Sequence, residues 1–165
     1  MTTRTRTAAA AMVVVGAIAG ATAIPALTGA QTNGAREITV RMKVRDGTEI
    51  HHAKRPKGDK PAPGDAVIIR LKMFSPTGTA IGSAYTECVK VGRAGGLRAP
   101  LQCMQTYNFR DGQIVTAGVV RFSDLESISI PIVGGSGAYR GASGQLTAGE
   151  PVKGFASVDV LHLDG

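Results

Sequence analysis

Apolar and polar residues alternate along most of the chain. In EITVRMKV (37–44), every second residue from Ile38 to Val44 is apolar and the residues between them are polar. AVIIRLKMF (66–74) has the same pattern, with arginine and lysine on its polar face. Because side chains in a strand point alternately to its two faces, this period of two predicts strands with one buried face.

Segments of this kind recur at short intervals, separated by turn residues such as RDG, SPTG and RAGG. The predicted strands are 37–44, 66–74, 84–92, 99–109, 112–122, 127–133, 141–148 and 152–163. Closing such antiparallel strands into a barrel leaves no unpaired edge. We therefore predict an all-β fold, an eight-stranded antiparallel β-barrel that forms one domain over residues 31–165. Residues 45–65, rich in Lys, Pro and Gly, are expected to form a mobile loop over one rim.

The first thirty residues have a different composition. Two arginines precede an uncharged, largely apolar run (8–24), and small residues follow at Thr28 and Ala30. This order of basic, apolar and small residues is typical of a secretory signal peptide. We expect residues 1–30 to be cleaved, so that the mature protein is secreted or extracellular and keeps no stable membrane span. The alternative is an uncleaved membrane anchor.

Charge and aromatic content argue against a nucleic-acid partner. The chain has 19 basic and 12 acidic side chains, and loss of the two arginines in residues 1–30 leaves 17 against 12, a net charge of +5. These charges are scattered, apart from a basic cluster at residues 54–60 that we interpret as a solvated loop. Four Phe, three Tyr and no Trp offer few platforms on which bases could stack.

Two cysteines are placed symmetrically about a Gly-Gly turn. Cys88 precedes Gly95 by seven residues, and Cys103 follows Gly96 by seven residues. If the flanking strands fold back at this turn, the cysteines face each other in an antiparallel pair, within reach of a disulfide. On a chain-entropy estimate, such a bridge stabilises the fold by about 3 kcal/mol. The alternative is a pair of buried free thiols.

The segment IPIVGGSGAYRGASGQL (130–146) is rich in glycine and has three possible interpretations. Its glycine spacing misses the dinucleotide-binding pattern by one residue, and no helix is predicted after it. The residues around Ser136 lack the last glycine of a nucleophile elbow and its strand-to-helix context. We interpret the segment as a corner between two strands, where glycine permits sharp bends and close backbone approach.

No metal site is predicted. His51 and His52 are adjacent, so their side chains point apart in an extended segment, and no spaced Cys, His or carboxylate accompanies them. Asp159 and Glu87 fall on predicted strands. Each is explained as well by an outward-facing charge as by a catalytic acid.

The glycine-rich segment, together with YNFRDGQIVTAG (107–118), resembles the allene oxide cyclase barrel family and is also similar to plant dirigent proteins. GDAVIIRLKMF (64–74) and IGSAYTEC (81–88) look like the second and third strands of the cyclases. The resemblance covers most of residues 64–165 and implies an eight-stranded barrel with an apolar cavity, often trimeric. Cyclases steer closure of an unstable fatty-acid epoxide and dirigents steer radical coupling, so both hold a reactive apolar molecule in one conformation.

Several positions depart from the pattern of the cyclases. The resemblance places their first-strand glutamate and asparagine at Met42 and Val44, and their second-strand asparagine at Leu71. Their barrel cysteine is matched by Cys88, which a disulfide with Cys103 would occupy. The chemistry of the cyclases therefore does not carry over intact.

Register and alternation together predict what lines the barrel. The inward-facing residues expected to line a ligand cavity are Val40, Met42, Leu71, Met73, Thr86, Gln105 and Tyr107. This lining is apolar with a few neutral hydrogen-bonding groups, which suits a small hydrophobic molecule. The alternative is that these side chains fill the barrel completely. Arg140 keeps one arginine of the dirigent pattern and is expected at the rim, whereas Ser143 replaces the other.

Two functions are compatible with these features. The first is a secreted, cofactor-free cyclase, isomerase or dirigent-like protein. In it, Tyr107 is the candidate catalytic residue that orients or protonates the substrate, helped by Thr86 and Gln105. The second is a non-catalytic barrel that binds a lipid or other metabolite, or that serves as a structural protein of the cell envelope. Neither requires a cofactor, and the expected partners are a small hydrophobic molecule and further copies of the chain in a trimer or dimer.

Overall fold

The computed structural model describes residues 35–50, 62–93, 99–121, 123 and 128–164. The predicted signal peptide, the Gly95-Gly96 turn, and most of the predicted basic loop, including both of its histidines, lie outside these residues. Within the described ranges, no helix has the length and hydropathy needed to cross a membrane.

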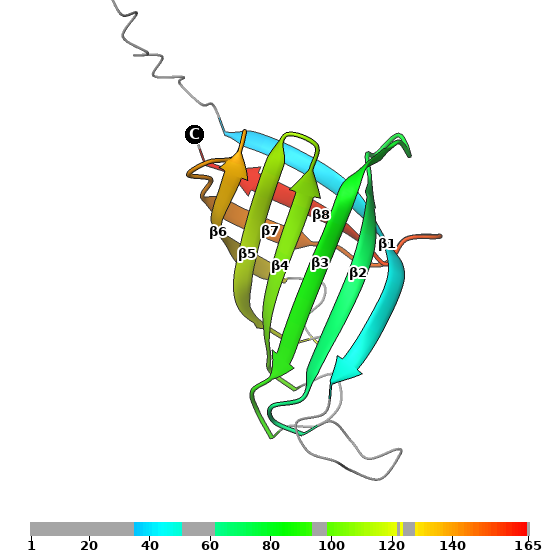
Figure 1. The fold of residues 1–165 in the computed structure, drawn as a ribbon, viewed down its shortest axis with the longest axis vertical. Helices are drawn as coiled ribbons and strands as arrows, with labels where there is room; N and C mark the ends of the chain where they lie inside the picture. Colours follow the sequence, from blue (N-terminus) through cyan, green and yellow to red (C-terminus); the bar gives the residue numbers. More distant parts are fainter. Residues whose placement is uncertain (1–34, 51–61, 94–98, 122, 124–127, 165) are drawn as a thin grey trace, which may run out of the picture. The chain divides into compact units, whose positions relative to one another are not determined.

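Eight antiparallel strands close into a barrel in sequence order, with β1 pairing with both β2 and β8 (Figure 1). The strands are β1 (Arg36–Ile50), β2 (Ala66–Phe74), β3 (Ala80–Lys90), β4 (Leu101–Phe109), β5 (Gly112–Val120), β6 (Ser129–Gly137), β7 (Gly144–Ala148) and β8 (Ser157–Leu163). Every strand has two hydrogen-bonded neighbours. The predicted all-β, eight-stranded antiparallel barrel is therefore confirmed.

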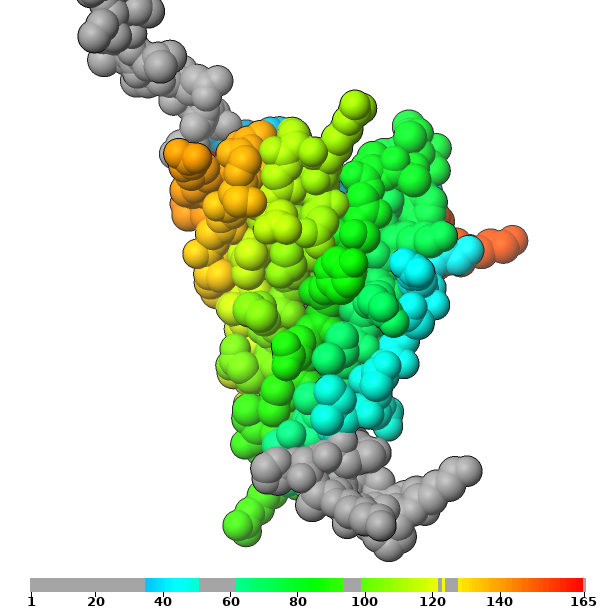
Figure 2. Space-filling view, in the orientation of Figure 1, coloured from blue at the N-terminus to red at the C-terminus, as the bar shows by residue number. Residues whose placement is uncertain are grey.

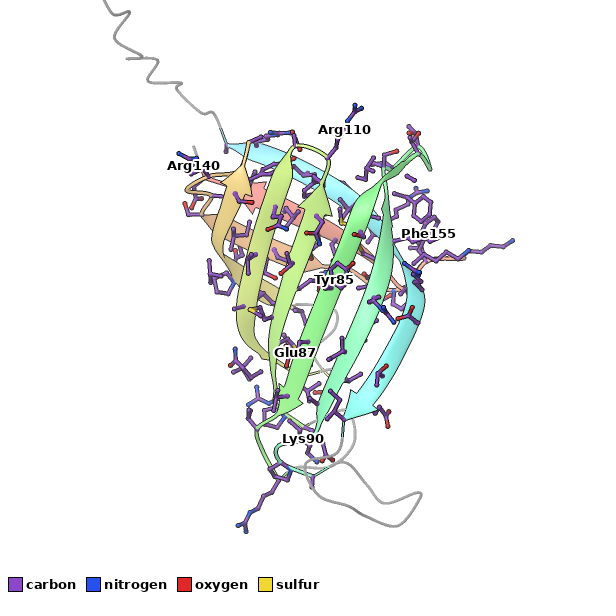
Figure 3. The ribbon with its side chains drawn as sticks, viewed as in Figure 1. Tyr85, Glu87, Lys90, Arg110, Arg140 and Phe155 are labelled. Atoms are coloured by element: carbon purple, nitrogen blue, oxygen red, sulfur yellow. A yellow bond between two sulfur atoms is a disulfide. The ribbon has the colours of Figure 1, made fainter. Side chains whose placement is uncertain are left out.

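The sequential order of the strands gives the barrel two distinct ends. Odd-numbered strands begin at the end that contains Arg110, in the β4–β5 hairpin, and finish at the end where β3 stops at Lys90 (Figure 3). We call these the Arg110 end and the Lys90 end. Tyr85 and Glu87, which alternate with inward-facing residues of β3, lie on the outer surface of the barrel (Figure 3).

Strand β1 is longer than predicted and changes its alternation part of the way along. Its register with β2 shifts between Val44 and Asp46, so Arg45 is an extra residue in β1. Because a bulge of this kind moves the following residues to the opposite face, Asp46 lies on the outer surface and forms an ion pair with Arg70 of β2. The predicted end of this strand at residue 44 was therefore wrong.

The glycine-rich segment is divided between a strand and a turn. Its first three glycines belong to β6, and the connection to β7 follows over residues 138–143. Gly137 has a φ of 60°, and a Cβ on Gly135 would lie 2.3 Å from the carbonyl oxygen of Tyr139, so both positions favour glycine. The predicted corner is therefore confined to the second part of the segment. Strand β8 also starts later than predicted, after a short turn closed by a bridge between Val152 and Phe155.

Candidate functional site

The half of the barrel nearer the Lys90 end contains a cavity of about 280 Å³. Its lining is mostly apolar, and every strand contributes to it. From β1 to β8, the lining includes Met42, Leu71, Thr86, Gln105, Val120, Ile130, Leu146 and Asp159. Figure 2 shows that the side chains of β3 to β5 form a continuous outer surface around this part of the barrel.

The half nearer the Arg110 end is filled by side chains. Val40, Met73, Tyr107, Ile114 and Leu161 have no exposed surface, and they pack in a single core cluster. They come from five different strands and interdigitate across the interior. The two alternatives that the sequence left open, a cavity and a filled barrel, thus each describe one half of the molecule.

A buried polar pair lies where the two halves meet. The hydroxyl of Tyr107 donates a hydrogen bond of 2.7 Å to Oδ2 of Asp159, and Nε2 of Gln105 lies 3.4 Å from the same oxygen. Asp159 is only 3% exposed and lines the cavity. Its other oxygen, Oδ1, is buried and has no hydrogen-bond partner among the described residues. The carboxyl group therefore has one oxygen fixed by Tyr107 and one oxygen that is unpartnered.

Burial controls the protonation of this pair. It raises the pKa of Asp159, although the hydrogen bond from Tyr107, and then the nearby polar groups of Ser157 and Gln105, act in the opposite direction. Burial, followed by the charge and the hydrogen-bonding of Asp159, raises the pKa of Tyr107 well above its ordinary value. Tyr107 therefore remains a neutral phenol and donates a hydrogen bond to Asp159. Asp159 keeps its own proton to a higher pH than an exposed aspartate does.

The predicted disulfide is present in the wall of the cavity. Cys88 and Cys103 are directly opposite each other in the β3–β4 ladder, with their Cα atoms 4.0 Å apart, and their sulfur atoms are bonded. Both residues line the cavity. They are the only cysteines in the sequence, so the chain contains no free thiol.

The structure separates the predicted lining into two groups. Met42, Leu71, Thr86 and Gln105 line the cavity. The other three, Val40, Met73 and Tyr107, face inward but belong to the filled half and do not line the cavity. Alternation identifies the face of a strand on which a side chain lies, but it does not give the depth of that side chain along the barrel. Tyr107, the predicted catalytic residue, reaches the cavity only through its hydrogen bond to Asp159.

Arg140 lies far from the cavity. It occupies the connection between β6 and β7, at the Arg110 end (Figure 3), whereas the cavity is in the half nearer the Lys90 end. Arg140 therefore lies at a rim of the barrel, but at the end opposite to the cavity. The strand order determines this end, because in a sequential antiparallel barrel the β4–β5 and β6–β7 connections share one end.

Asp159 is the site residue for which the sequence analysis left two interpretations open, an outward-facing charge and a catalytic acid. It has the same parity along β8 as Leu161 and Leu163, which are both buried. Val158 and Val160 make the other face of the strand equally apolar, so alternation in this segment does not decide which face points inward. The pairing of Asp159 with Val40, an inward-facing residue of β1, resolves this ambiguity.

A second depression, of about 950 Å³, opens at the Arg110 end between the β2–β3 and β4–β5 hairpins (Figure 2). It is lined by Arg36, Phe109, Arg110 and Tyr139, among others, and the guanidinium of Arg36 lies 5.7 Å from the centre of the Tyr139 ring. It is wide and open to solvent, so it excludes little water. The smaller cavity inside the barrel is therefore the candidate site. In the described part of the chain, no group of three His, Cys, Asp or Glu residues is placed to hold a metal ion.

Comparisons with known proteins agree with this architecture. The profile of the family described as "Allene oxide cyclase barrel like domain" matches residues 37–153. A pyocyanin demethylase has a similar structure, with 21% identity and a TM-score of 0.64 over 78% of this chain and 100% of that chain. AbnU, an exo-specific intermolecular Diels-Alderase, has 15% identity and a TM-score of 0.62 over 80% and 99% of the two chains. No curated protein matches the sequence.

A dirigent protein is found among the similar structures as well. The pterocarpan synthase dirigent protein GePTS1 has 16% identity and a TM-score of 0.60 over 79% of this chain and 87% of that chain. At these identities the likeness establishes the fold alone. Because the three proteins carry different activities on one architecture, function has to be argued from the cavity of this chain.

Proposed function

The chain belongs to the allene oxide cyclase barrel-like family, and we propose that it binds a small, mainly apolar molecule in its cavity and steers the rearrangement of that molecule without a cofactor. The observation that carries this proposal is the cavity itself, an apolar space of about 280 Å³ with one buried acid, Asp159, in its wall. Apolar walls supply affinity by removing apolar surface from water. Confinement supplies rate, because it holds a flexible substrate close to its reactive conformation.

Asp159 is the group suited to assist such a reaction. A protonated carboxyl group can give its proton to a substrate oxygen as a new bond forms, and the resulting carboxylate can take a proton back from the intermediate. The net result is an isomerisation or cyclisation that consumes no proton and no cofactor. Tyr107 is a positioning residue in this scheme, since its hydroxyl contacts Asp159 and not the cavity.

The proposal places the protein in an oxidising compartment after export. The Cys88–Cys103 disulfide supports this placement, because disulfides form and persist mainly outside the cytosol. The predicted cleavage of residues 1–30 and the predicted trimer or dimer remain predictions.

Native mass spectrometry tests the proposed binding. The full chain is exported through an oxidising route and purified gently, and the mass of any retained molecule is measured. Leu71→Trp adds a large side chain to the cavity wall and should abolish the retained mass and the binding of apolar fluorescent probes. Met104→Trp adds the same side chain to the half-exposed outer face of β4 and should leave both unchanged. An empty wild-type protein that also ignores the probes would contradict the proposal.

A non-catalytic carrier is the second candidate, and it is favoured by the apolar side chains of Met42 and Leu71 in the cavity wall. Asp159→Asn distinguishes the two functions. Isomerisation leaves the mass unchanged, so the molecules retained by the wild type and the variant are compared by chromatographic retention and NMR. Different isomers in the two proteins indicate catalysis, with the variant holding the unreacted form. The same isomer in both indicates a carrier.

A further inference from the structure

The two oxygens of Asp159 are in different environments. Oδ2 receives the hydrogen bond from Tyr107 and faces Gln105, whereas Oδ1 has no partner in the described part of the chain. Both oxygens belong to a residue that is only 3% exposed and that lines the cavity. A buried polar atom without a partner costs free energy, so a ligand that supplies the missing partner is favoured over one that does not.

The groups around Asp159 determine what this partner can be. In the sheet, Asp159 lies between Val40 of β1 and Ala148 of β7, and Ser157 precedes it by two residues on β8. Across the interior it faces Tyr107 and Gln105 of β4. Of these, Tyr107 is the one that titrates, and it stays neutral because its pKa is raised. The described residues that line the cavity include no Lys, Arg or His. No cation in this lining compensates an ionised Asp159 or pairs with an anionic ligand.

We propose that the cavity selects a compact, uncharged ligand that carries a hydrogen-bond acceptor, such as a ketone oxygen. This oxygen lies at the inner end of the bound ligand and receives a hydrogen bond from Oδ1–H of Asp159. The inference rests on the proposed function, since it specifies the ligand of the same cavity. In this arrangement Tyr107 holds Oδ2 as the acceptor and so leaves the proton of the carboxyl group on Oδ1. The carboxyl group thus distinguishes ligands by a single acceptor atom.

The volume of the cavity sets the size of this ligand. A dry protein cavity of about 150 Å³ is large enough for benzene. A cavity of about 280 Å³ is nearly twice as large, which suits a bicyclic molecule. A long acyl chain would have to extend beyond the cavity.

A matched pair of ligands tests the inference. 1-Tetralone and tetralin share one bicyclic skeleton, and the ketone oxygen is their principal difference. Affinities are measured by NMR titration of the isotope-labelled, exported protein between pH 4.5 and 9. At low pH, tetralone is expected to bind about three- to tenfold more tightly than tetralin, because one hydrogen bond to a buried partner contributes a net effect of this size. The preference should decline as the pH rises through the pKa of Asp159, since the carboxylate has no proton to donate.

Two variants assign the preference to Asp159. Asp159→Asn retains an oxygen for the Tyr107 hydroxyl and places an amide N–H at the position of Oδ1, so it should keep the preference for tetralone at every pH. Asp159→Leu removes the donor and should bring the two affinities to within about twofold. A preference for tetralone that persists in Asp159→Leu would overturn the inference.

Charged ligands provide a further control. 2-Naphthoate should bind more weakly than tetralone, because no cation in the described lining meets its carboxylate. 1-Aminotetralin tests the opposite charge state. If this cation binds more tightly than tetralone and loses its affinity in Asp159→Asn, Asp159 is ionised in the complex and the inference is overturned.

The outcomes separate this inference from the function on which it rests. If tetralone and tetralin bind with equal affinity at every pH, the cavity binds apolar molecules as proposed but Asp159 does not select among them. That result would overturn the inference alone. If neither ligand binds and apolar probes also fail, both the inference and the proposed function are contradicted.

Discussion

The two halves of the barrel interior are built from the same strands but differ in packing. Near the Arg110 end, Val40, Met73, Ile114 and Leu161 are completely buried and fill the space between the walls. Near the Lys90 end, polar residues such as Thr86 and Gln105 join apolar ones in the lining, and a cavity of about 280 Å³ remains. A closed barrel of eight strands is wide enough for either arrangement. The packing of the inward-facing side chains therefore decides which half is available to a ligand.

Stability and binding are consequently separated along the barrel axis. The filled half supplies the packing that stabilises the fold. The open half has fewer contacts across its interior, and it is the half in which a disulfide links two neighbouring strands. Tyr107 and Asp159 lie at the boundary, with Tyr107 buried in the filled half and Asp159 exposed to the cavity. Each of the following experiments changes one side of this comparison.

Truncating one leucine in the filled half and one in the open half should have the largest effect on the free energy of unfolding. The two values should differ because the two halves are packed differently. Leu161→Ala removes a fully buried side chain from the filled half, and we expect it to lower the free energy of unfolding by about 4 kcal/mol. Leu71→Ala removes the same atoms from a side chain that already borders the cavity, so the cost should be about 2 kcal/mol. Urea-induced unfolding of both variants measures the two values. Equal costs would show that the two halves are packed alike.

Loss of the disulfide in the open half should be the next largest effect, because the bridge restricts the conformations of the unfolded chain. Replacing Cys88 and Cys103 together by alanine should lower the free energy of unfolding by about 3 kcal/mol, given a separation of 15 residues between them. Reduction of the wild-type protein by dithiothreitol is the matched control and should produce a similar loss. A double variant that unfolds at the same urea concentration as the oxidised wild type would contradict the assigned role of the bridge.

Much of the fold could be predicted from the sequence. Alternation located all eight strands, and the equal spacing of Cys88 and Cys103 about the Gly-Gly turn predicted their pairing. Both are local properties, since a period of two and a single hairpin involve only neighbouring segments. The predictions that failed concern interruptions of that period. Arg45 is an additional residue in β1 that shifts the alternation, and the sequence RDG (45–47), which contains it, predicts the end of the strand instead.

The site was harder to predict because depth inside a barrel depends on how all the strands are staggered. Alternation placed Tyr107 and Gln105 on the same face of β4, but it could not show that Gln105 lines the cavity and that Tyr107 is buried beneath it. Asp159 was ambiguous because both faces of β8 are apolar around it. Its position depends on pairing with β1, a contact between the two ends of the folded domain that closes the barrel.

The smallest expected effect is a pH dependence of the free energy of unfolding, and it is caused by Asp159 at the boundary between the two halves. Burial raises the pKa of Asp159 above the value of about 3.9 that it has in an unfolded chain. As the pH rises between these two pKa values, the unfolded state loses this proton while the folded state retains it. The free energy of unfolding therefore declines across this window and stays lower above it. The contribution of the protonated Asp159 to stability is fully present only below the pKa that this residue has in the unfolded chain.

Asp159→Asn removes this titration while keeping an acceptor for the Tyr107 hydroxyl. We expect the variant to lack the decline and to be more stable than the wild type above the folded pKa of Asp159, by less than the cost of losing the disulfide. The measurement is the free energy of unfolding in urea from pH 3.5 to pH 8. Glu87→Gln removes a carboxyl group from the outer face of β3 and controls for the change in net charge (Figure 3). A difference between wild type and Asp159→Asn that is constant with pH would show that burial does not shift this carboxyl group. The cavity would then contain an ordinary carboxylate, and Asp159 would lose its proton at the same pH as an exposed aspartate.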